Sequence, residues 1–407
     1  MPFVIFVAPF FSDPASRTMA AIATLPGVRL GVISQQRQEE APDYLHGLLA
    51  AHWRVDEVLD PEQLVRAAKD LSAMVGAPIH RLWGSLEQAQ VPIAEARELL
   101  GVTGMSAETT RAFRDKAKMK DILRAAGIPC ARHALVRSLD EGRAAAVRIG
   151  YPLVVKPPDG AGSVSTFRVE NDAQLLVALG AAPPTAEHPT LLEEFIVGEE
   201  HSLETISIDG RAVWHSLTHY RPTPLDVVRN QWIQWCVLLP REVDDPQFDD
   251  IKKAAAGGLK ALGMQTGLTH LEWFRRTDGS VAIGEVGARP PGAQITTLTS
   301  RANDFDFVQE WARTVIFGEF RPPVRKYAVG AAFLRGQGTG TVRAVHGIET
   351  VVREFGALVC DHRLPTIGMG RTGSYEGEGF IIVRHPETAV VSDALTRIVS
   401  LIHVELG

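Results

Sequence analysis

The N-terminal part of the chain alternates apolar runs with amphipathic segments, and this order restricts the fold more than any other feature. Residues 3–8 form a continuous apolar run ending at Pro9, which is typical of a strand buried on both faces of a parallel sheet. Further elements are expected in alternation, with helices at 14–25, 61–74 and 91–100 and strands at 28–33 and 79–83. This order predicts a doubly wound α/β domain over residues 1–105. The turn after the first strand lacks the GxGxxG pattern of a dinucleotide site.

Composition limits the class of protein. The chain has 407 residues, of which 45% are hydrophobic and 22% charged, so roughly two to three folded domains are expected. Its net charge of −6 disfavours a nucleic-acid or membrane-surface partner, because such proteins usually carry a basic excess. No apolar run reaches the ~18 residues of a membrane span, no basic leader is seen, and the three cysteines lie far apart. These features predict a cytoplasmic protein without a disulfide framework or zinc site.

The pattern changes in the middle of the chain. A charged helix is expected to begin at Ser106. Further along, two strands at 267–274 and 280–286 are expected to form a hairpin, because Thr277-Asp278-Gly279 between them is a typical turn sequence.

The C-terminal part reads as a smaller α+β unit. Short alternating segments, such as 329–334 and 380–383, predict an antiparallel sheet. A helix over about 387–404 is expected to close it. We place this subdomain at 325–407 and a central domain at 106–324.

A glycine-rich stretch, Asp-Gly-Ala-Gly-Ser at 159–163, directly follows a predicted strand that ends in Lys156. Glycines let backbone N–H groups close on phosphate oxygens, and a lysine at a strand end supplies a fixed positive charge. The stretch is not a Walker loop, since GxxxxGK[ST] is absent. A plain tight turn is the alternative reading of the same residues.

Two carboxylates stand at matching positions on the predicted hairpin. Glu272 and Glu285 lie at similar distances from the turn, so they should face each other. Paired carboxylates suit Mg²⁺ bridging to nucleotide phosphates, and two solvated glutamates on a sheet face are the alternative. Arg289, just beyond the second strand, can hold a phosphoryl group or a carboxylate through bidentate hydrogen bonds.

Other residues are candidates for the remaining parts of a site. The segment 193–196 (Glu-Glu-Phe-Ile) is an extended, apolar segment whose free backbone groups can hydrogen-bond the edge of an adenine ring. The alternative is that it is the exposed acidic end of a loop. His215, His219 and His270 are candidates for substrate binding, although a buried structural histidine is the commoner case. The aromatic cluster of Trp232 and Trp235 suggests an apolar lid or pocket, or core packing.

The order of these features resembles the ATP-grasp superfamily. The matching stretches, which run from about residue 111 to 297, are Asp115-Lys116, 127–129 (GIP), 150–157 (GYPLVVKP), 192–203 (LEEFIVGEEHSL) and 285–292 (EVGARPPG). The flanking segments are similar to the rest of that family's three-part layout. The resemblance implies that 106–324 is the ATP-grasp domain, with a nucleotide lid at about 130–195.

The resemblance also implies roles for single residues. Those implied to bind ATP are Lys116, Lys156, Gly160, Gly162, Ser163, Glu193, Glu194, Phe195, Ile196 and Glu200, with Gly160, Gly162 and Ser163 in the lid. Glu200 is preferred to Glu199 as the ribose ligand by alignment to Ser202.

The same resemblance assigns the metal and the catalytic groups. Glu272 and Glu285 would bind Mg²⁺, or Mn²⁺ in its place, and Arg289 and Lys156 would be catalytic. Many members have asparagine two residues after the second metal glutamate, where this chain has Gly287. One of the two usual metal ions is therefore expected to be held more weakly or by water.

A ligase reaction follows from this resemblance. Such enzymes use ATP to convert a carboxylate into an acyl phosphate, which an amine then attacks. An amino-acid or peptide-like acceptor is ranked first, because Arg289 can clamp a carboxylate beside a mixed polar and aromatic wall. The expected partners are small carboxylates and amines, and a homodimer is left open. A biotin-carboxylase-like or purine-biosynthesis-like enzyme, or a nucleotide-binding module without ligase activity, are the alternatives.

Overall fold

The computed structural model describes residues 1–159, 166–230 and 233–407. Its first sheet is wholly parallel, with strand order β3-β2-β1-β4. The strands are β1 (Phe3–Val7), β2 (Arg29–Ser34), β3 (Leu49–Arg54) and β4 (Ile79–Gly84), and the helices are α1 (Asp13–Ala23), α2 (Pro61–Val75) and α3 (Gln90–Leu100). The predicted parallel α/β domain is confirmed. The strand β3 was not predicted, because its mixed sequence, LAAHWR, has no clear period.

The charged segment after Ser106 forms two helices rather than the single one expected. They are α4 (Ala107–Arg114) and α5 (Lys116–Ala125). Asp115 between them has an extended backbone, and its carboxylate accepts hydrogen bonds from the N–H groups of Ala117 and Lys118. Asp115 is therefore the C-cap of α4 and the N-cap of α5. Lys116 and Lys120, both on α5, are buried.

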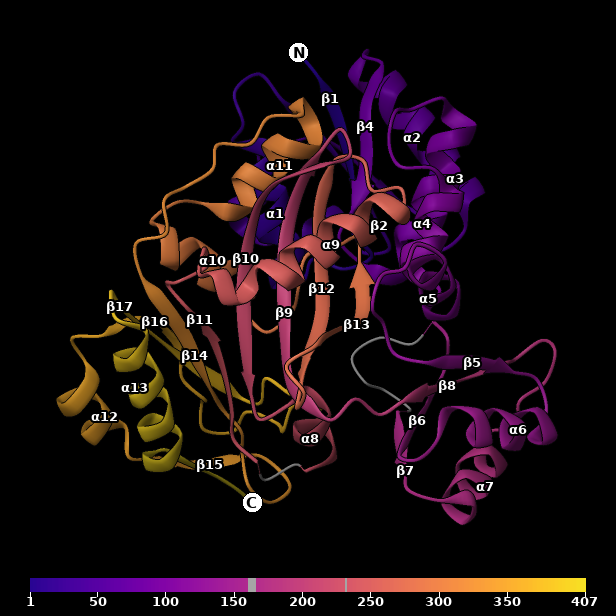
Figure 1. The fold of residues 1–407 in the computed structure, drawn as a ribbon. Coiled ribbons are helices and arrows are strands. Elements are labelled where there is room, and N and C mark those ends of the chain that lie inside the picture. Colours follow the sequence, from indigo (N-terminus) through magenta and orange to yellow (C-terminus); the bar gives the residue numbers. More distant parts are fainter. Residues whose placement is uncertain (160–165, 231–232) are drawn as a thin grey trace.

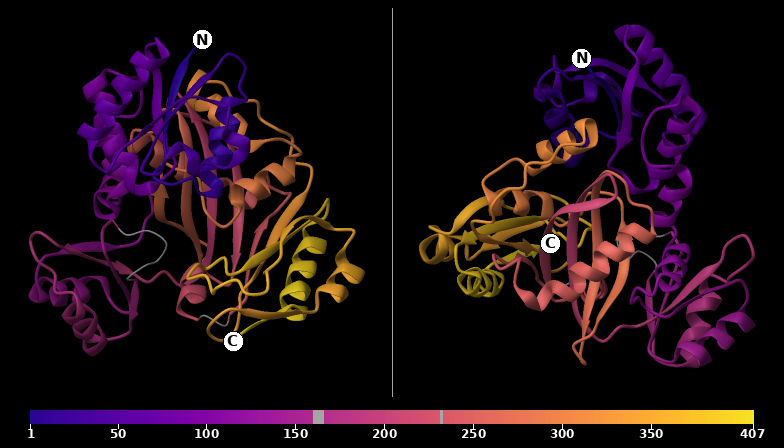
Figure 2. Two further views of the ribbon diagram at one scale, coloured as in Figure 1. Left: turned by 180° about the vertical axis from the view of Figure 1, so that it is seen from behind. Right: turned by 45° about the horizontal axis from the view of Figure 1, so that its top comes forward.

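A small antiparallel sheet stands beside the main body, with strand order β5-β8-β6-β7. Its elements are β5 (His133–Val136), α6 (Leu139–Ile149), β6 (Leu153–Lys156), β7 (Phe167–Val169), α7 (Asp172–Ala181) and β8 (Thr190–Glu194). The two helices bury an apolar core against the sheet. In both views of Figure 2 this unit lies at the edge of the molecule, away from the C-terminal part.

The central sheet has eight strands in the order β13-β12-β9-β10-β11-β14-β17-β16. They are β9 (Gly198–Ile208), β10 (Arg211–Arg221), β11 (Trp235–Leu239), β12 (Gly267–Arg276), β13 (Val281–Gly287), β14 (Ala328–Leu334), β16 (Val359–Arg363) and β17 (Gly379–His385). The antiparallel C-terminal strands are thus present as predicted. They continue the central sheet through the β11–β14 pair instead of forming a sheet of their own.

Helices cover both faces of this sheet (Figure 1). The helices α9 (Asp249–Ala261) and α13 (Thr388–Leu401) pack on one face, and α10 (Ile295–Asn303) and α11 (Phe307–Phe317) on the other. The side chains of α11 also pack against β1 and α1, which fixes the N-terminal domain to the central sheet.

The chain end differs from the predicted helix. The helix α13 stops at Leu401, and β18 (His403–Leu406) then pairs with β15 (Val342–His346). The remaining helices are α8 (Pro224–Arg229) and α12 (Ile348–Phe355), and four short 3₁₀ turns lie at Gln38–Glu40, Asp43–Leu45, Glu87–Ala89 and Pro246–Phe248. Within the described ranges, no helix combines the length and apolarity needed to cross a membrane.

Candidate active site

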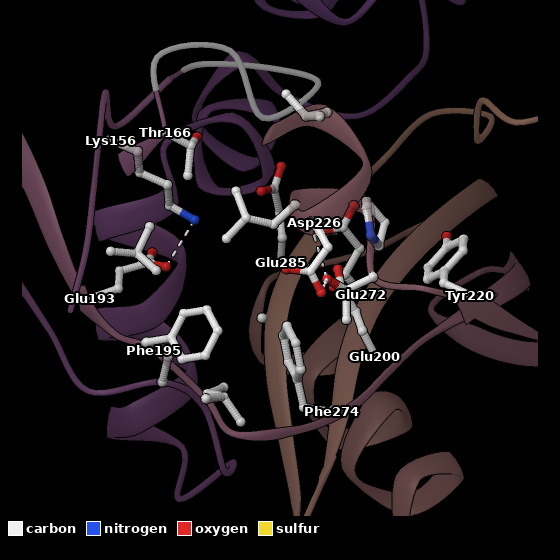
Figure 3. Close-up of a pocket in the computed structure, with 18 of the residues that line it drawn as sticks. Lys156, Thr166, Glu193, Phe195, Glu200, Tyr220, Asp226, Glu272, Phe274 and Glu285 are labelled. Atoms are coloured by element: carbon white, nitrogen blue, oxygen red, sulfur yellow. Dashed lines mark hydrogen bonds and ion pairs between the residues drawn. The ribbon is translucent and has the colours of Figure 1, made fainter. Parts of the chain in front are cut away.

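A cavity of about 330 Å³ lies between the small sheet and the β12–β13 edge of the central sheet. Figure 3 shows Lys156 and Glu193 on one side of it and Glu272, Glu285 and Glu200 on the other. Of the residues predicted from the sequence, those lining the cavity are Lys116, Lys156, Glu193, Glu194, Phe195, Ile196, Glu200, His270, Glu272, Glu285 and Arg289. The predicted lid residues Gly160, Gly162 and Ser163 fall outside the described residues, as does Trp232.

A buried carboxylate between two lysines anchors one wall. Glu193 on β8 lies 2.7 Å from the Lys120 Nζ and 2.8 Å from the Lys156 Nζ, and the Lys120 ammonium also donates to the carbonyl of Gly284 on β13 (2.7 Å). Burial alone would raise the pKa of Glu193, but the two ammonium groups lower it to about 2. The side chain of Glu193 was expected at an adenine hinge. The same side chain lines the cavity and also pairs with Lys156.

The predicted carboxylate pair is formed. Glu272 on β12 and Glu285 on β13 are direct partners in the antiparallel register, and Glu285 also lies 3.0 Å from the Nζ of Lys116. Burial acts to raise the pKa of Glu272, but His270 and Arg289 outweigh it and lower that pKa to about 2. Among the described residues, no group of three or more histidine, cysteine or acidic side chains could hold a metal ion. Two carboxylates with hard oxygen donors fit Mg²⁺, whose other positions are usually filled by water and phosphate.

The glycine at the usual asparagine position has a local explanation. A Cβ atom built on Gly287 would lie 3.3 Å from the Cγ atom of Arg289. The arginine side chain therefore occupies the space beside this backbone position, which an asparagine would crowd.

Arg289 is held by a residue of the N-terminal domain. Its Nε atom donates to Glu87 Oε2 (2.8 Å), and Nη1 donates to the carbonyl of Pro290 (3.0 Å). Arg114 on α4 binds the other oxygen of Glu87 (3.0 Å). Sequence reasoning missed Glu87 and Lys120, because each acts through a partner far away in the chain.

A second buried network lies behind Glu272. The Nδ1 atom of His270 is 2.8 Å from Glu204 Oε1, and Nε2 is 3.6 Å from Glu272 Oε1. Glu204 is fully buried and also accepts hydrogen bonds from Ser202 (2.7 Å) and Thr218 (3.0 Å). Burial acts to lower the pKa of His270, but Glu204 and Glu272 raise it to about 9. His270 therefore lies between two carboxylates.

The choice between neighbouring glutamates agrees with the structure. Glu200 lines the cavity and is nearly buried, whereas the side chain of Glu199 is 83% exposed. Burial and the neighbouring Glu272 carboxylate raise the pKa of Glu200 well above its usual range.

Two predicted histidines do not reach the cavity. Side chains alternate along β10, and Tyr220 faces the cavity, so His219 and His215 point to the other face of the sheet. There His219 Nδ1 lies 2.8 Å from His201 Nδ1, and His215 Nε2 lies 3.7 Å from Asp244. This corrects the expectation that both line the substrate site. Tyr220 of the same strand lines the cavity, together with Asp226, Phe274 and Tyr375, which sequence reasoning missed.

Known proteins share both the sequence pattern and the fold. Residues 121–305 match the family model of the ATP-grasp domain. The L-arginine-specific L-amino acid ligase of Bacillus subtilis is 25% identical over 285 residues, which is 68% of this chain and 67% of that protein. The alanine–anticapsin ligase of the same species (strain 168) is 26% identical over 304 residues, or 69% of this chain and 61% of that protein.

Among solved structures, the L-amino acid ligase of Bacillus licheniformis superposes with a TM-score of 0.79 at 19% identity, covering 100% of this chain and 99% of that one. That structure has the same overall fold as this chain. Residues 121–305 thus match an ATP-grasp domain, and the proteins that the chain resembles in sequence and in fold include amino acid ligases.

Proposed function

We propose that the enzyme joins two amino acids, or an amino acid and a related amine, by converting a carboxylate into an acyl phosphate at the expense of ATP. The observation that supports this is the convergence of two lysines, two facing glutamates and one arginine on a single cavity. The amino-acid ligases among the sequence relatives favour amino acids as substrates.

The nucleotide would lie against the small sheet. Val154, Phe195 and Phe274 supply apolar walls for an adenine ring, and the guanidinium of Arg168 lies 4.0 Å from the Phe195 ring centre, which adds a cation–π contact to that wall. Lys156 and Lys116 lie where they can neutralise the phosphates, and Glu200 can accept hydrogen bonds from ribose hydroxyls.

The two glutamates would hold the metal. Glu272 and Glu285 would bind Mg²⁺, which supplies positive charge to the phosphates and to the leaving ADP. The carboxylate oxygen of the substrate attacks the γ-phosphorus and ADP leaves. The amine then attacks the acyl carbon, gives up one proton, and inorganic phosphate leaves. Arg289 can hold the substrate carboxylate or the phosphoryl group, because Glu87 fixes its orientation.

The test is phosphate release from ATP and Mg²⁺ with single amino acids and with pairs of them, followed by mass spectrometry of the products. The proposal predicts release that depends on amino acids and a condensed product lighter than the two substrates by one water. Release that instead requires bicarbonate and no amino acid would contradict it and support the carboxylase alternative. Glu285→Gln serves as the inactive control.

A further inference from the structure

One part of the cavity wall, away from Lys156, consists of aromatic and aliphatic side chains. We call this part the aromatic chamber and define it by Tyr220, Trp235, Ala293, Ile295 and Tyr375, which all line the cavity. In the view of Figure 3, Tyr220 lies on the far side of Glu272 and Glu200 from Lys156. The chamber therefore lies next to the carboxylates but away from the lysine end.

The rings of the chamber are fixed by one another. Trp235 stacks on Tyr220, with ring centres 5.9 Å apart, and meets Tyr375 edge-on at 5.1 Å. On its other side Trp235 stacks on Phe333 of β14 at 5.0 Å. Rings packed in offset and edge-on arrangements stabilise one another, so the apolar wall is rigid.

Tyr375 comes from the C-terminal part of the chain, between β16 and β17, and is held to the loop that follows Arg289. The carboxylate of its neighbour Glu376 accepts hydrogen bonds from the backbone N–H of Ala293 (3.0 Å) and from the side-chain amide of Gln294 (3.2 Å). Ala293 and Gln294 both have positive φ, +53° and +56°, a conformation uncommon for residues other than glycine. Glu376 therefore stabilises a strained turn at the chamber wall.

Gly292 shows how closely Tyr375 approaches this loop. A Cβ atom at position 292 would lie 2.5 Å from the Tyr375 hydroxyl oxygen. The Tyr375 hydroxyl therefore lies directly against this loop, and a Cβ atom at position 292 would displace it. Tyr375 thus helps to set the size of the chamber that it lines.

The chemistry around the chamber matches an amino acid with an apolar side chain. Arg289 is a cation in the cavity wall that can bind a carboxylate, while Asp226 is an acidic group in the same wall that can bind an ammonium. The residues that define the chamber carry aromatic rings and aliphatic groups and no charged side chain, so the burial of a charged substrate side chain there would be costly.

We propose that the aromatic chamber binds the apolar side chain of the amino acid whose carboxylate is phosphorylated, and that Tyr375 limits the size of that side chain. This inference rests on the proposed function. The C-terminal part of the chain then determines substrate choice as well as completing the sheet.

The test compares glycine, alanine, valine, leucine and phenylalanine as carboxylate substrates, with one fixed amine, in wild type and variants. We expect Tyr375→Ala to raise kcat/KM for phenylalanine relative to alanine by about tenfold or more. This is the discrimination that one apolar group in a binding pocket usually provides. Tyr375→Phe keeps the ring and should retain the wild-type preference. Tyr375→Trp should shift the preference toward small side chains.

The possible outcomes distinguish failure of the inference about the chamber from failure of the proposed function. An unchanged preference in Tyr375→Ala, in a variant that still turns over ATP with amino acids, overturns the inference. If Tyr375→Ala does not fold, an unchanged preference in Tyr375→Trp overturns it in the same way. A wild-type enzyme that responds to no amino acid refutes the proposed function instead.

Discussion

Replacing Glu193 by glutamine should destabilise the small sheet, although the two side chains have the same shape. Wild-type Glu193 neutralises the buried ammonium group of Lys120, at 2.7 Å, and the partly buried one of Lys156, at 2.8 Å. A neutral amide leaves both without a full counter-charge in a site where Glu193 is only 5% exposed. Removing one partner of a buried ion pair costs about 3–5 kcal/mol.

Hydrogen exchange of the backbone amides in β6 and β8 measures this loss of stability directly. A loss of about 3 kcal/mol should lower their protection factors by roughly 10²-fold, since each ~1.4 kcal/mol is tenfold. Glu194→Gln is the matched control. Its partners Arg132 and Arg276 have side chains 60% and 26% exposed, so we expect a loss of about 1 kcal/mol or less and a change under about tenfold.

The effect should also depend on pH in one direction. The pKa of Glu193 in the folded protein, about 2, lies below its ordinary value of 4.5. Its stabilisation is therefore complete above pH 4.5 and is lost as the pH falls toward 2. The difference between wild type and Glu193→Gln should narrow over that window. Protection factors within twofold of wild type at pH 7, or a difference that widens on acidification, would refute the reasoning.

Three further results are expected. Glu285→Gln should lower turnover by roughly 10², because the charge opposite Glu272 is lost, and normal turnover at limiting Mg²⁺ would make the pair structural. Arg289→Lys should lower kcat by about tenfold or more, since an ammonium cannot hold Glu87 and the substrate in the fixed geometry of a guanidinium; an unchanged kcat would remove Arg289 from the reaction. A chain ending at residue 325 should not fold, because it lacks β14, β16 and β17 and leaves β11 as an unpaired apolar edge; a soluble, active product would contradict this.

The carboxylate pair was predictable because a local feature sets its register. Thr277-Asp278-Gly279 forms the turn, with Gly279 at φ +83° and Asp278 accepting hydrogen bonds from Ser280. The pairing of Glu272 with Glu285 survives a bulge directly after Glu272. A hairpin of this kind depends only on neighbouring residues.

Other features depend on contacts between distant segments. Nothing near Lys120 in the sequence shows that Glu193 is its partner, and nothing near Arg289 indicates Glu87. The merger of the C-terminal strands with the central sheet depends on the β11–β14 pairing, which is equally long-range. The break at Asp115 had a local signal, because aspartate is a preferred N-cap residue.

The histidines of β10 illustrate a different limit. Alternation along a strand shows that His219 and Tyr220 cannot share a face. Both faces of this strand carry polar residues, so the pattern does not say which face meets the cavity.

The central claim, that a substrate carboxylate becomes an acyl phosphate, is tested most directly by isotope transfer. The enzyme is incubated with ATP, Mg²⁺, an acceptor amine and an apolar amino acid in which both carboxylate oxygens are ¹⁸O, and the released phosphate is analysed by mass spectrometry. Attack of the carboxylate oxygen on the γ-phosphorus predicts one ¹⁸O atom in each phosphate formed with product. Product accompanied by unlabelled phosphate would contradict the acyl phosphate and the roles proposed for Lys156, Glu272, Glu285 and Arg289.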